Sequence, residues 1–278
     1  MKNQIITSVR VRPRGGIVPT VISVALLAFA SATHAQQIYS TQFENPPFVA
    51  GFTLAGQDGW VAPGIFNPNA AVISADQPRQ GKQSVQVQGS NLEHSDLVNG
   101  LTDGYYDSVG SYRRAVNFDT GGALKVRISA HVRIDGPATP GLNFFSAALA
   151  VRAAVIDSDG NVIDTAGAGQ IDLSSDGHAH GNDGNHNVPV FLSDAPMALG
   201  VWHELAIVED FVARTFTLSV DDQPLGTYAF PEDVNSNMLV RGALLTFVAP
   251  DAGGNSKSAY TASYDKFNIS VIGKTGGF

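Results

Sequence analysis

The sequence predicts an all-β protein built from two antiparallel sheets that pack face to face. Residues 124–135 alternate strictly between apolar and polar side chains, which is the period-two pattern of a half-buried strand. About ten to thirteen short segments of strand type are separated by Gly, Pro, Asn and Asp turns. No segment shows a convincing amphipathic helix pattern, and strands with one polar face favour antiparallel sheets.

The first 35 residues have the pattern of a secretory signal peptide. An apolar stretch at 17–30 and small residues before a boundary after Ala35 follow a basic start, formed by Lys2, Arg10, Arg12 and Arg14. The alternative is an uncleaved membrane anchor, but the apolar run is shorter than the roughly 20 residues of a spanning helix. We therefore expect a single secreted domain at 36–278, periplasmic or extracellular, with no membrane span.

The composition narrows the classes of partner. Cleavage would leave 13 of the 17 Lys and Arg residues against all 25 Asp and Glu residues. Such an acidic chain disfavours nucleic acid as a partner, because phosphate binding needs positive charge. The sequence contains no cysteine, which excludes disulfides, thiolate nucleophiles and cysteine-bound metals. A secreted chain of this length can close a core without disulfides.

Local pattern and turn signals predict the strands of the first half in order. A strand at 38–44 is rich in aromatic and β-branched residues and ends at two prolines. The polar turn 76–82 separates short strands at 71–74 and 84–88. Longer strands follow at 111–118, 124–135 and 144–157.

The second half begins with a hairpin turn at 157–161 that leads into a strand at 162–163. Residues 164–200 are rich in Gly, Asp, Asn, Ser and His, and are predicted to form a long loop with one or two short strands. The remaining strands are predicted at 202–208, 215–220, 225–230, 239–248 and 260–272.

Several of these segments resemble a known fold family. Trp202 followed by the strand Thr215–Asp221 resembles the Trp-strand and xLxVDG strand of concanavalin A-like lectin and glucanase jelly rolls, laminin-G-like modules included. Asp222 stands where that family often has glycine. Residues 39–44 and 263–269 are similar to the paired first and last strands of secreted bacterial jelly rolls. The resemblance implies a jelly-roll β-sandwich with a concave sheet on which sugar chains lie.

Glu44 and Asp265 form a candidate metal site. Asp265 shares the parity of the apolar residues in its strand, so its carboxylate is predicted to point inward, where it needs a partner or a cation. Pairing of the first and last strands would bring Glu44 close, and two carboxylates with backbone carbonyls suit a structural Ca²⁺ ion. The resemblance implies calcium there as well. Alternatively, both acids lie at solvated strand ends.

The polar face of 124–135 is a candidate ligand-binding surface. It carries a basic stripe, which we define as Lys125, Arg127, His131 and Arg133, and Arg152 could extend the stripe from the next strand. On a concave sheet, the stripe could bind the carboxylates or sulfates of an acidic polysaccharide. On a convex sheet, its charges would only prevent edge pairing. Trp60 follows a turn and could stack on sugar rings, as could Tyr105, Tyr106 and Tyr112.

Segment 176–186 contains three histidines and two aspartates. In an extended conformation, His178 and His180 would share a face and could bind a transition metal. The glycine content favours a mobile, solvated loop instead.

Catalytic motifs are sparse. The five glutamates do not form the E-x-D-x-x-E pattern of glucanases, and Glu204 and Glu209 are predicted to lie on opposite faces of one strand. Alginate-lyase jelly rolls use Q-I-H, where this chain has Gln170-Ile171-Asp172. A lyase stays open as an alternative, although nothing in the sequence selects its residues. Its candidate residues are His131, Arg127 and Tyr112.

Taken together, these features favour a secreted, lectin-like carbohydrate-binding module at or outside the cell envelope. The first alternative is an enzyme that degrades an acidic polysaccharide, a lyase before a hydrolase. The second alternative is an adhesion or matrix module that binds protein. The expected partner is a polysaccharide, and the expected cofactor is calcium.

Overall fold

A computed structural model describes most of the chain, and the described residues lie in the second of two compact units, Thr33–Phe278. The structure describes residues 36–62, 67–92, 108–120, 125–136, 144–182, 190–249 and 258–272. Within these ranges, no helix is long and apolar enough to cross a membrane. The leader expected at 1–35 lies outside the described residues, as do Tyr105 and Tyr106.

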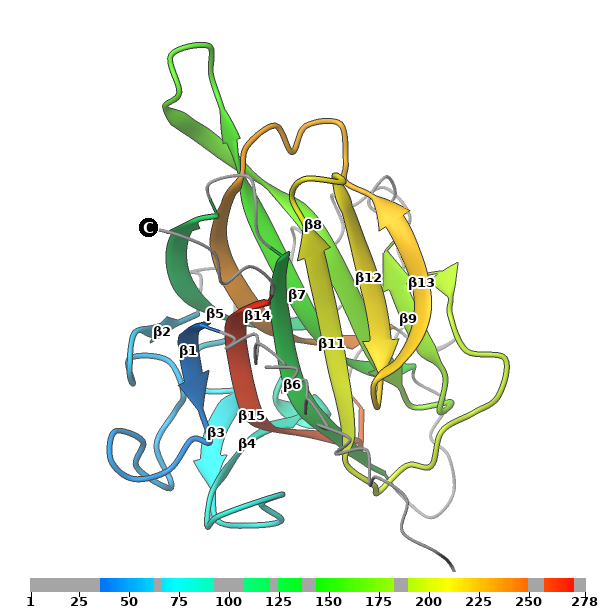
Figure 1. Ribbon diagram of the computed structural model, residues 1–278. Coiled ribbons are helices and arrows are strands. Elements are labelled where there is room, and N and C mark those ends of the chain that lie inside the picture. The colour runs from blue at the N-terminus through cyan, green and yellow to red at the C-terminus, as the bar shows by residue number, and fades with distance from the viewer. Residues whose placement is uncertain are drawn as a thin grey trace, which may run out of the picture. The chain divides into compact units, whose positions relative to one another are not determined.

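The described residues form strands β1 to β15 and one short 3₁₀ helix, η1 (Gly89–Asn91) (Figure 1). The first strands are β1 (Gln36–Thr41), β2 (Trp60–Val61), β3 (Ala71–Ser74), β4 (Ser84–Gln88), β5 (Ser108–Asp119), β6 (Lys125–Asp135), β7 (Phe145–Ile156) and β8 (Val162–Ser174). The others are β9 (Ala179–Asn182), β10 (Val190–Phe191), β11 (His203–Asp210), β12 (Thr215–Val220), β13 (Gln223–Ala229), β14 (Met238–Val248) and β15 (Thr261–Ile272).

These strands form two antiparallel sheets, which we call sheet A and sheet B. Sheet A has the order β13-β12-β11-β6-β15-β4-β3, and β1 also pairs with β15. Sheet B has the order β10-β9-β8-β7-β14-β5-β2. Figure 1 shows the sheets as two layers, with β6, β11 and β12 in front of β7 and β8. The predicted all-β, two-sheet jelly-roll sandwich is therefore confirmed.

Apolar side chains from the facing sides of both sheets fill the core. On β6, Val126 and Ile128 are fully buried, whereas Lys125 is exposed. On β7, Leu149 and Val151 join the same core, but Ala148 belongs to a separate small cluster. Because side chains alternate along a strand, this pattern identifies which residues of each strand face the core and which face outward. Burial of the inward side chains is the main stabilising contribution to the fold.

The terminal strands pair as the sequence predicts. β1 and β15 are antiparallel, with Gln36 opposite Val271 and Thr41 opposite Phe267. β15 also pairs with β6 and β4, so the last strand of the described chain lies inside sheet A. β1 thus pairs with β15, which also pairs with β6. This pairing brings the segment that follows β1 close to Asp265.

The long loop predicted at 164–200 is wrong in its first part. β8 continues to Ser174 and pairs with β7 along its length, and β9 follows after a short turn. Sequence pattern missed this strand because 164–174 is rich in Gly, Ala and Asp, which are depleted in strands. Tertiary packing decides instead: Gly169 lies against sheet A, where an added Cβ would be 2.9 Å from Ile207 Cγ2.

The β12–β13 turn explains why aspartate can replace the glycine common in similar folds. Asp221 and Asp222 have positive φ angles of 49° and 62°, a conformation that Asp tolerates better than most residues. The Asp221 carboxylate accepts the Glu204 backbone N–H at 2.8 Å and lies 2.7 Å from His203 Nδ1. These bonds hold the turn without glycine.

Candidate functional site

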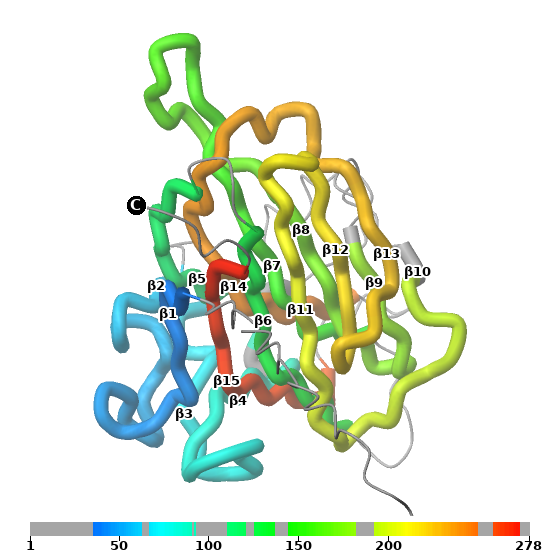
Figure 2. The backbone as a smooth tube through the Cα atoms, in the orientation of Figure 1, coloured from blue at the N-terminus to red at the C-terminus, as the bar shows by residue number. Residues whose placement is uncertain are grey.

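A groove of about 660 Å³ lies on the outer face of sheet B. Its floor comes from β5, β14, β7 and β8, which run side by side in the sheet (Figure 2). Residues 231–233, which follow β13, form part of its wall. The floor residues alternate with core residues such as Leu149 and Leu244, so they face away from the sandwich interior.

Three arginines from three strands line this groove. Arg152 lies opposite Arg241 in the pairing of β7 with β14, and Arg113 on β5 lies opposite Ala243. Arg152 Nη1 donates to the Thr165 carbonyl oxygen at 2.8 Å, and Arg241 Nη2 donates to Thr165 Oγ1 at 3.3 Å. Burial and the nearby charges of Arg241 and Arg152 lower the pKa of Arg113 to about 10. Arg113 therefore stays positively charged at neutral pH, as arginine side chains in proteins generally do.

A second polar cluster lies on the same face, at the next outward position of β8 after the groove residue Gln170. Asp172 has no exposed surface, and its carboxylate oxygens have no hydrogen-bond partner in the described part of the chain. Burial raises the pKa of Asp172 to about 7. His180 of β9 lies opposite, with Nδ1 3.8 Å from Asp172 Oδ2, and its ring stacks on Phe144. Burial also lowers the pKa of His180, so both groups favour their neutral forms.

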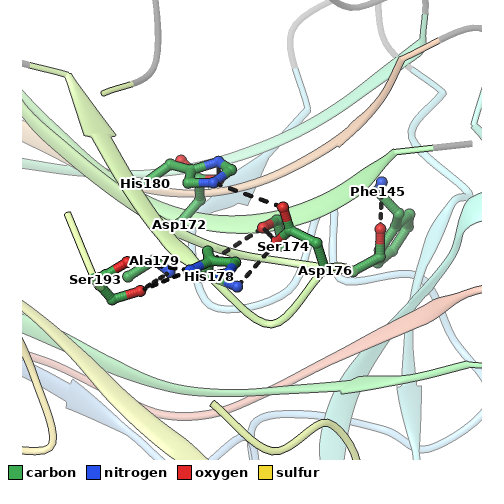
Figure 3. Close-up of polar contacts among 9 residues, drawn as sticks. Phe145, Asp172, Ser174, Asp176, His178, Ala179, His180 and Ser193 are labelled. Carbon is green, nitrogen blue, oxygen red and sulfur yellow. Dashed lines mark hydrogen bonds and ion pairs between the residues drawn. The ribbon is translucent and has the colours of Figure 1, made fainter. Parts of the chain in front are cut away.

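Asp176 extends this cluster toward the surface. Figure 3 shows it facing His180 from the turn after β8, with Asp176 Oδ2 4.0 Å from His180 Nε2. The Ser174 hydroxyl and the His178 backbone N–H, the latter at 2.9 Å, both donate to Asp176 Oδ1. The His180 imidazole therefore lies between the carboxyl groups of Asp172 and the partly exposed Asp176, at distances of 3.8 and 4.0 Å.

The mobile loop predicted at 176–186 is wrong for residues 179–182, which form β9. His178 is also fixed, because its Nδ1 donates to the Ser193 carbonyl oxygen at 3.1 Å. Residues 183–186 lie outside the described residues. Among the residues that are described, no group of three or more His, Cys, Asp or Glu side chains is arranged to hold a metal ion.

The basic stripe lies on the outer face of sheet A, away from the groove. Its cations are held by carboxylates, in the pairs Lys125–Asp210 at 3.0 Å, Arg127–Glu204 at 2.8 Å, Arg127–Asp222 at 3.0 Å and Arg133–Asp135 at 2.7 Å. The expectation that Arg152 extends the stripe is wrong, because β7 belongs to sheet B. The arginines of the stripe are therefore already paired with acids, unlike the arginines of the groove.

The three residues considered for a lyase do not converge. His131 is largely buried on the outer side of sheet A, near Arg127, and burial lowers its pKa to about 4. Tyr112 points into the core from sheet B: its hydroxyl donates to the Asn67 carbonyl oxygen and accepts the Ala71 N–H, both at 2.8 Å. Because Tyr112 and the other two face different sides of the sandwich, they cannot form one active site.

Trp60 does not present its ring to a ligand. It has no exposed surface and packs against Phe267 and Phe43, with ring centroids 5.0 and 5.8 Å away. Its Nε1 donates to the Tyr39 hydroxyl at 3.1 Å. The turn before Trp60 delivers it into the core, so the expectation that it stacks on sugars is wrong.

Glu44 and Asp265 both face the turn that joins β3 to β4. Asp265 Oδ2 accepts the backbone N–H groups of Arg79 and Gln80 at 3.1 Å each. Glu44 Oε1 accepts those of Lys82 and Gln83 at 2.6 and 3.0 Å. Asp265 is fully buried, but not through the predicted inward parity. The register of β15 shifts between Asp265 and Asn268, so Tyr264 and Phe267 both join the core, whereas Asp265 lies opposite the outward-facing His131 and is covered by the β3–β4 turn. Backbone N–H groups therefore already occupy Asp265 Oδ2 and Glu44 Oε1.

Sequence reasoning missed Arg113 and Arg241 as site residues. Arg113 follows the buried Tyr112, which is a signal that it faces outward. Arg241 follows the core residue Leu239 by two positions, so alternation places it inward, and only a register shift between them turns it outward. The sequence does not reveal that their strands lie next to each other and next to β7. Only the strand order of sheet B brings the three arginines together.

Comparisons with known proteins identify the fold. An endo-1,3-β-glucanase from Streptomyces sioyaensis has a TM-score of 0.55 at 10% identity, covering 86% of this chain and 97% of the glucanase chain. The conserved carbohydrate esterase of a Shiga toxin-encoding bacteriophage has a TM-score of 0.52 at 14% identity, covering 86% of this chain and all of the esterase chain. No family model and no curated protein matches the sequence. The chain has the concanavalin A-like jelly-roll fold that the sequence predicts.

Proposed function

We propose that this protein binds carbohydrate in the groove on the outer face of sheet B. The observation that carries the proposal is the groove itself, which is formed by outward polar side chains of four neighbouring strands and is open to solvent. Such a surface offers hydrogen-bond donors and acceptors to the hydroxyl groups of a sugar chain. Two solved structures with this fold are a glucanase and a carbohydrate esterase, which supports a carbohydrate ligand.

A variant that blocks the groove tests this proposal. Ala150 faces the groove from β7, and Ala150→Trp would fill the space with a large ring whatever the charge of the ligand. We expect the purified protein to be retained on immobilised polysaccharides and the variant to lose most of this retention. Val208→Trp, on the outer face of sheet A, is the matched control and should bind normally. Equal retention of both variants, or no retention of the parent protein on neutral and acidic polysaccharides, would contradict the proposal.

Cleavage of the bound glycan is a second candidate, favoured by the Asp172–His180 pair next to the groove. Asp172 has no exposed surface, so it could act only through His180. New reducing ends or the ultraviolet absorbance of unsaturated products would support an enzyme, and Asp172→Asn should then stop product formation while retention persists. Retention with no product from any retained glycan would leave binding as the whole function.

We also propose a calcium ion at Glu44 and Asp265, whose carboxylates both face the β3–β4 turn. A specific ion at one hundred times its dissociation constant adds about 2.7 kcal/mol of stability. Melting in excess calcium should therefore occur several degrees above melting in chelator, and Asp265→Asn should abolish the difference. Asp159→Asn, on the exposed β7–β8 turn, should preserve it. Identical melting of the parent protein in calcium and chelator would exclude the ion.

Export is proposed from the leader pattern at 1–35. N-terminal sequencing of the exported protein is expected to begin at Gln36. A retained leader would instead favour a membrane anchor.

A further inference from the structure

The three groove arginines form a cluster of like charges that the fold does not require. Arg152 and Arg241 are directly opposite each other on adjacent strands, an arrangement in which like charges destabilise a sheet. Arg113 adds a third charge from β5, at the next outward position of the same face. Among the residues that the structure describes, no carboxylate lies within ion-pair distance of any of the three, although the negative charge of Asp164 acts on Arg241 from farther away. The cluster therefore costs stability, and a bound anion would remove that cost.

The hydrogen bonds of these arginines orient them but leave most of their donors for a ligand. Thr165 receives one bond each from Arg152 and Arg241, and Ser111 Oγ receives the Arg113 Nε at 3.2 Å. Each guanidinium has several further N–H donors in a planar fork that matches a carboxylate. The Arg241 Nε is buried and has no hydrogen-bond partner within the described residues. The guanidinium groups are thus oriented before a ligand binds, and several of their N–H donors are still available to it.

The rest of the groove indicates which kind of anion fits. Asp164, Glu232 and Asp233 also line it, and the Gln170 amide lies on the floor. These acids would repel a densely charged polymer such as nucleic acid, as would the formal net charge of −8. A ligand whose carboxylates are separated by neutral hydroxyl-bearing rings could place an anion on the arginines and keep its neutral groups beside the acids.

We propose that Arg113, Arg152 and Arg241 form an anion subsite that selects acidic polysaccharides, with a sugar carboxylate held between the guanidinium groups. This inference rests on the proposed carbohydrate function and adds the class of ligand. The contrast with sheet A supports this proposal. Lys125, Arg127 and Arg133 of the basic stripe are each already paired with a carboxylate. An anion subsite needs unpaired cations, and these are in the groove.

Titration calorimetry with two oligosaccharides of equal length, an oligouronate and a neutral β-linked gluco-oligosaccharide, tests the subsite. Charge-assisted hydrogen bonds should make the oligouronate bind at least about tenfold more tightly. Arg152→Gln with Arg241→Gln should weaken oligouronate binding about 100-fold and leave neutral binding within about twofold. Affinity for the oligouronate should also fall between about 50 and 200 mM salt, and the double variant should lose that dependence.

The matched control is Arg127→Gln with Arg133→Gln, which removes two arginines from the outer face of sheet A and should preserve oligouronate affinity. Melting curves check that both double variants fold. Equal affinity for the two oligosaccharides, or full affinity in the Arg152 and Arg241 variant, would overturn the anion subsite and leave the carbohydrate proposal standing. Binding of neither oligosaccharide would overturn both.

Discussion

Replacing Glu209 by glutamine is expected to stabilise the protein at alkaline pH and to flatten its stability between about pH 4.5 and 8. Glu209 faces the core from β11, opposite Val126 and Phe216 in the neighbouring strands. It has no exposed surface, and both carboxyl oxygens have no hydrogen-bond partner in the described part of the chain. Burial raises its pKa from 4.5 to about 8.

The sign of the effect follows from proton binding. Between pH 4.5 and 8, the folded state keeps a proton on Glu209 that the unfolded state has released. The free energy of unfolding therefore falls as pH rises through this window and levels off above it. At about 1.4 kcal/mol per pKa unit, the decline reaches at most about 5 kcal/mol. Glutamine has the same shape and no charge to desolvate, so it should remove this decline.

Urea unfolding at pH 5, 7 and 9 measures how the free energy of unfolding changes with pH. The first two values lie inside the window from pH 4.5 to 8, and the third lies above it. Glu232→Gln, at an exposed position, is the control and should follow the parent protein. A smaller decline of stability with pH that remains in Glu209→Gln is attributed to Asp172, because burial raises the pKa of Asp172 to about 7. An unchanged slope in Glu209→Gln, or lower stability at pH 9, would mean that Glu209 is charged and partnered in the folded protein.

Trp60→Ala is expected to cost about 3–5 kcal/mol of unfolding free energy, the range for deleting a large buried aromatic side chain. The indole fills space between Phe43 and Phe267, and its Nε1 bond ends at the Tyr39 hydroxyl, which donates to Asp58 at 2.6 Å. Thermal melting should fall by about 10 °C for a domain of this size. The affinity of the folded protein for its glycan should not change, because the ring does not reach the groove.

Trp60→Phe keeps the measurement usable if the alanine variant does not fold. It preserves part of the packing and should lose less stability, again with unchanged glycan affinity. Loss of affinity in a folded Trp60→Phe protein would contradict the core position of the ring.

The parts of the fold that sequence predicts well are those fixed by local pattern. The alternation at 124–135 gives β6 and identifies its inward side, and the parity of Glu204 and Glu209 places them correctly on opposite faces. Local pattern predicts only the start of β8, at 162–163, because the strand state of the rest depends on pairing with β7 and on the space that Gly169 leaves for Ile207. Where contacts across the sandwich decide, local propensity is not sufficient.

The candidate site depends on the order of the strands in sheet B, and the alternation of residues along the sequence does not predict that order. Arg113, Arg152 and Arg241 come from segments far apart in the sequence and meet only because β5, β14 and β7 are neighbours. The basic stripe is predicted correctly as a set of residues on one face, but its ion pairs are not. Its residues share a face as predicted, but the acids that pair with Lys125 and Arg127 come mainly from β11 and the β12–β13 turn. A pattern of charges along one strand therefore does not show whether those charges are available.

Side-chain footprinting would show whether carbohydrate binds on the outer face of sheet B. The protein would be exposed to hydroxyl radicals with and without a saturating oligosaccharide, and oxidation of each segment measured by mass spectrometry. We predict protection of groove residues such as Pro231 and Leu245, with no change at Val208 or Met238, which lie outside the groove. Protection of Val208 and its neighbours on sheet A, with none at Pro231 and Leu245, would mean that carbohydrate binds on sheet A and not in the groove.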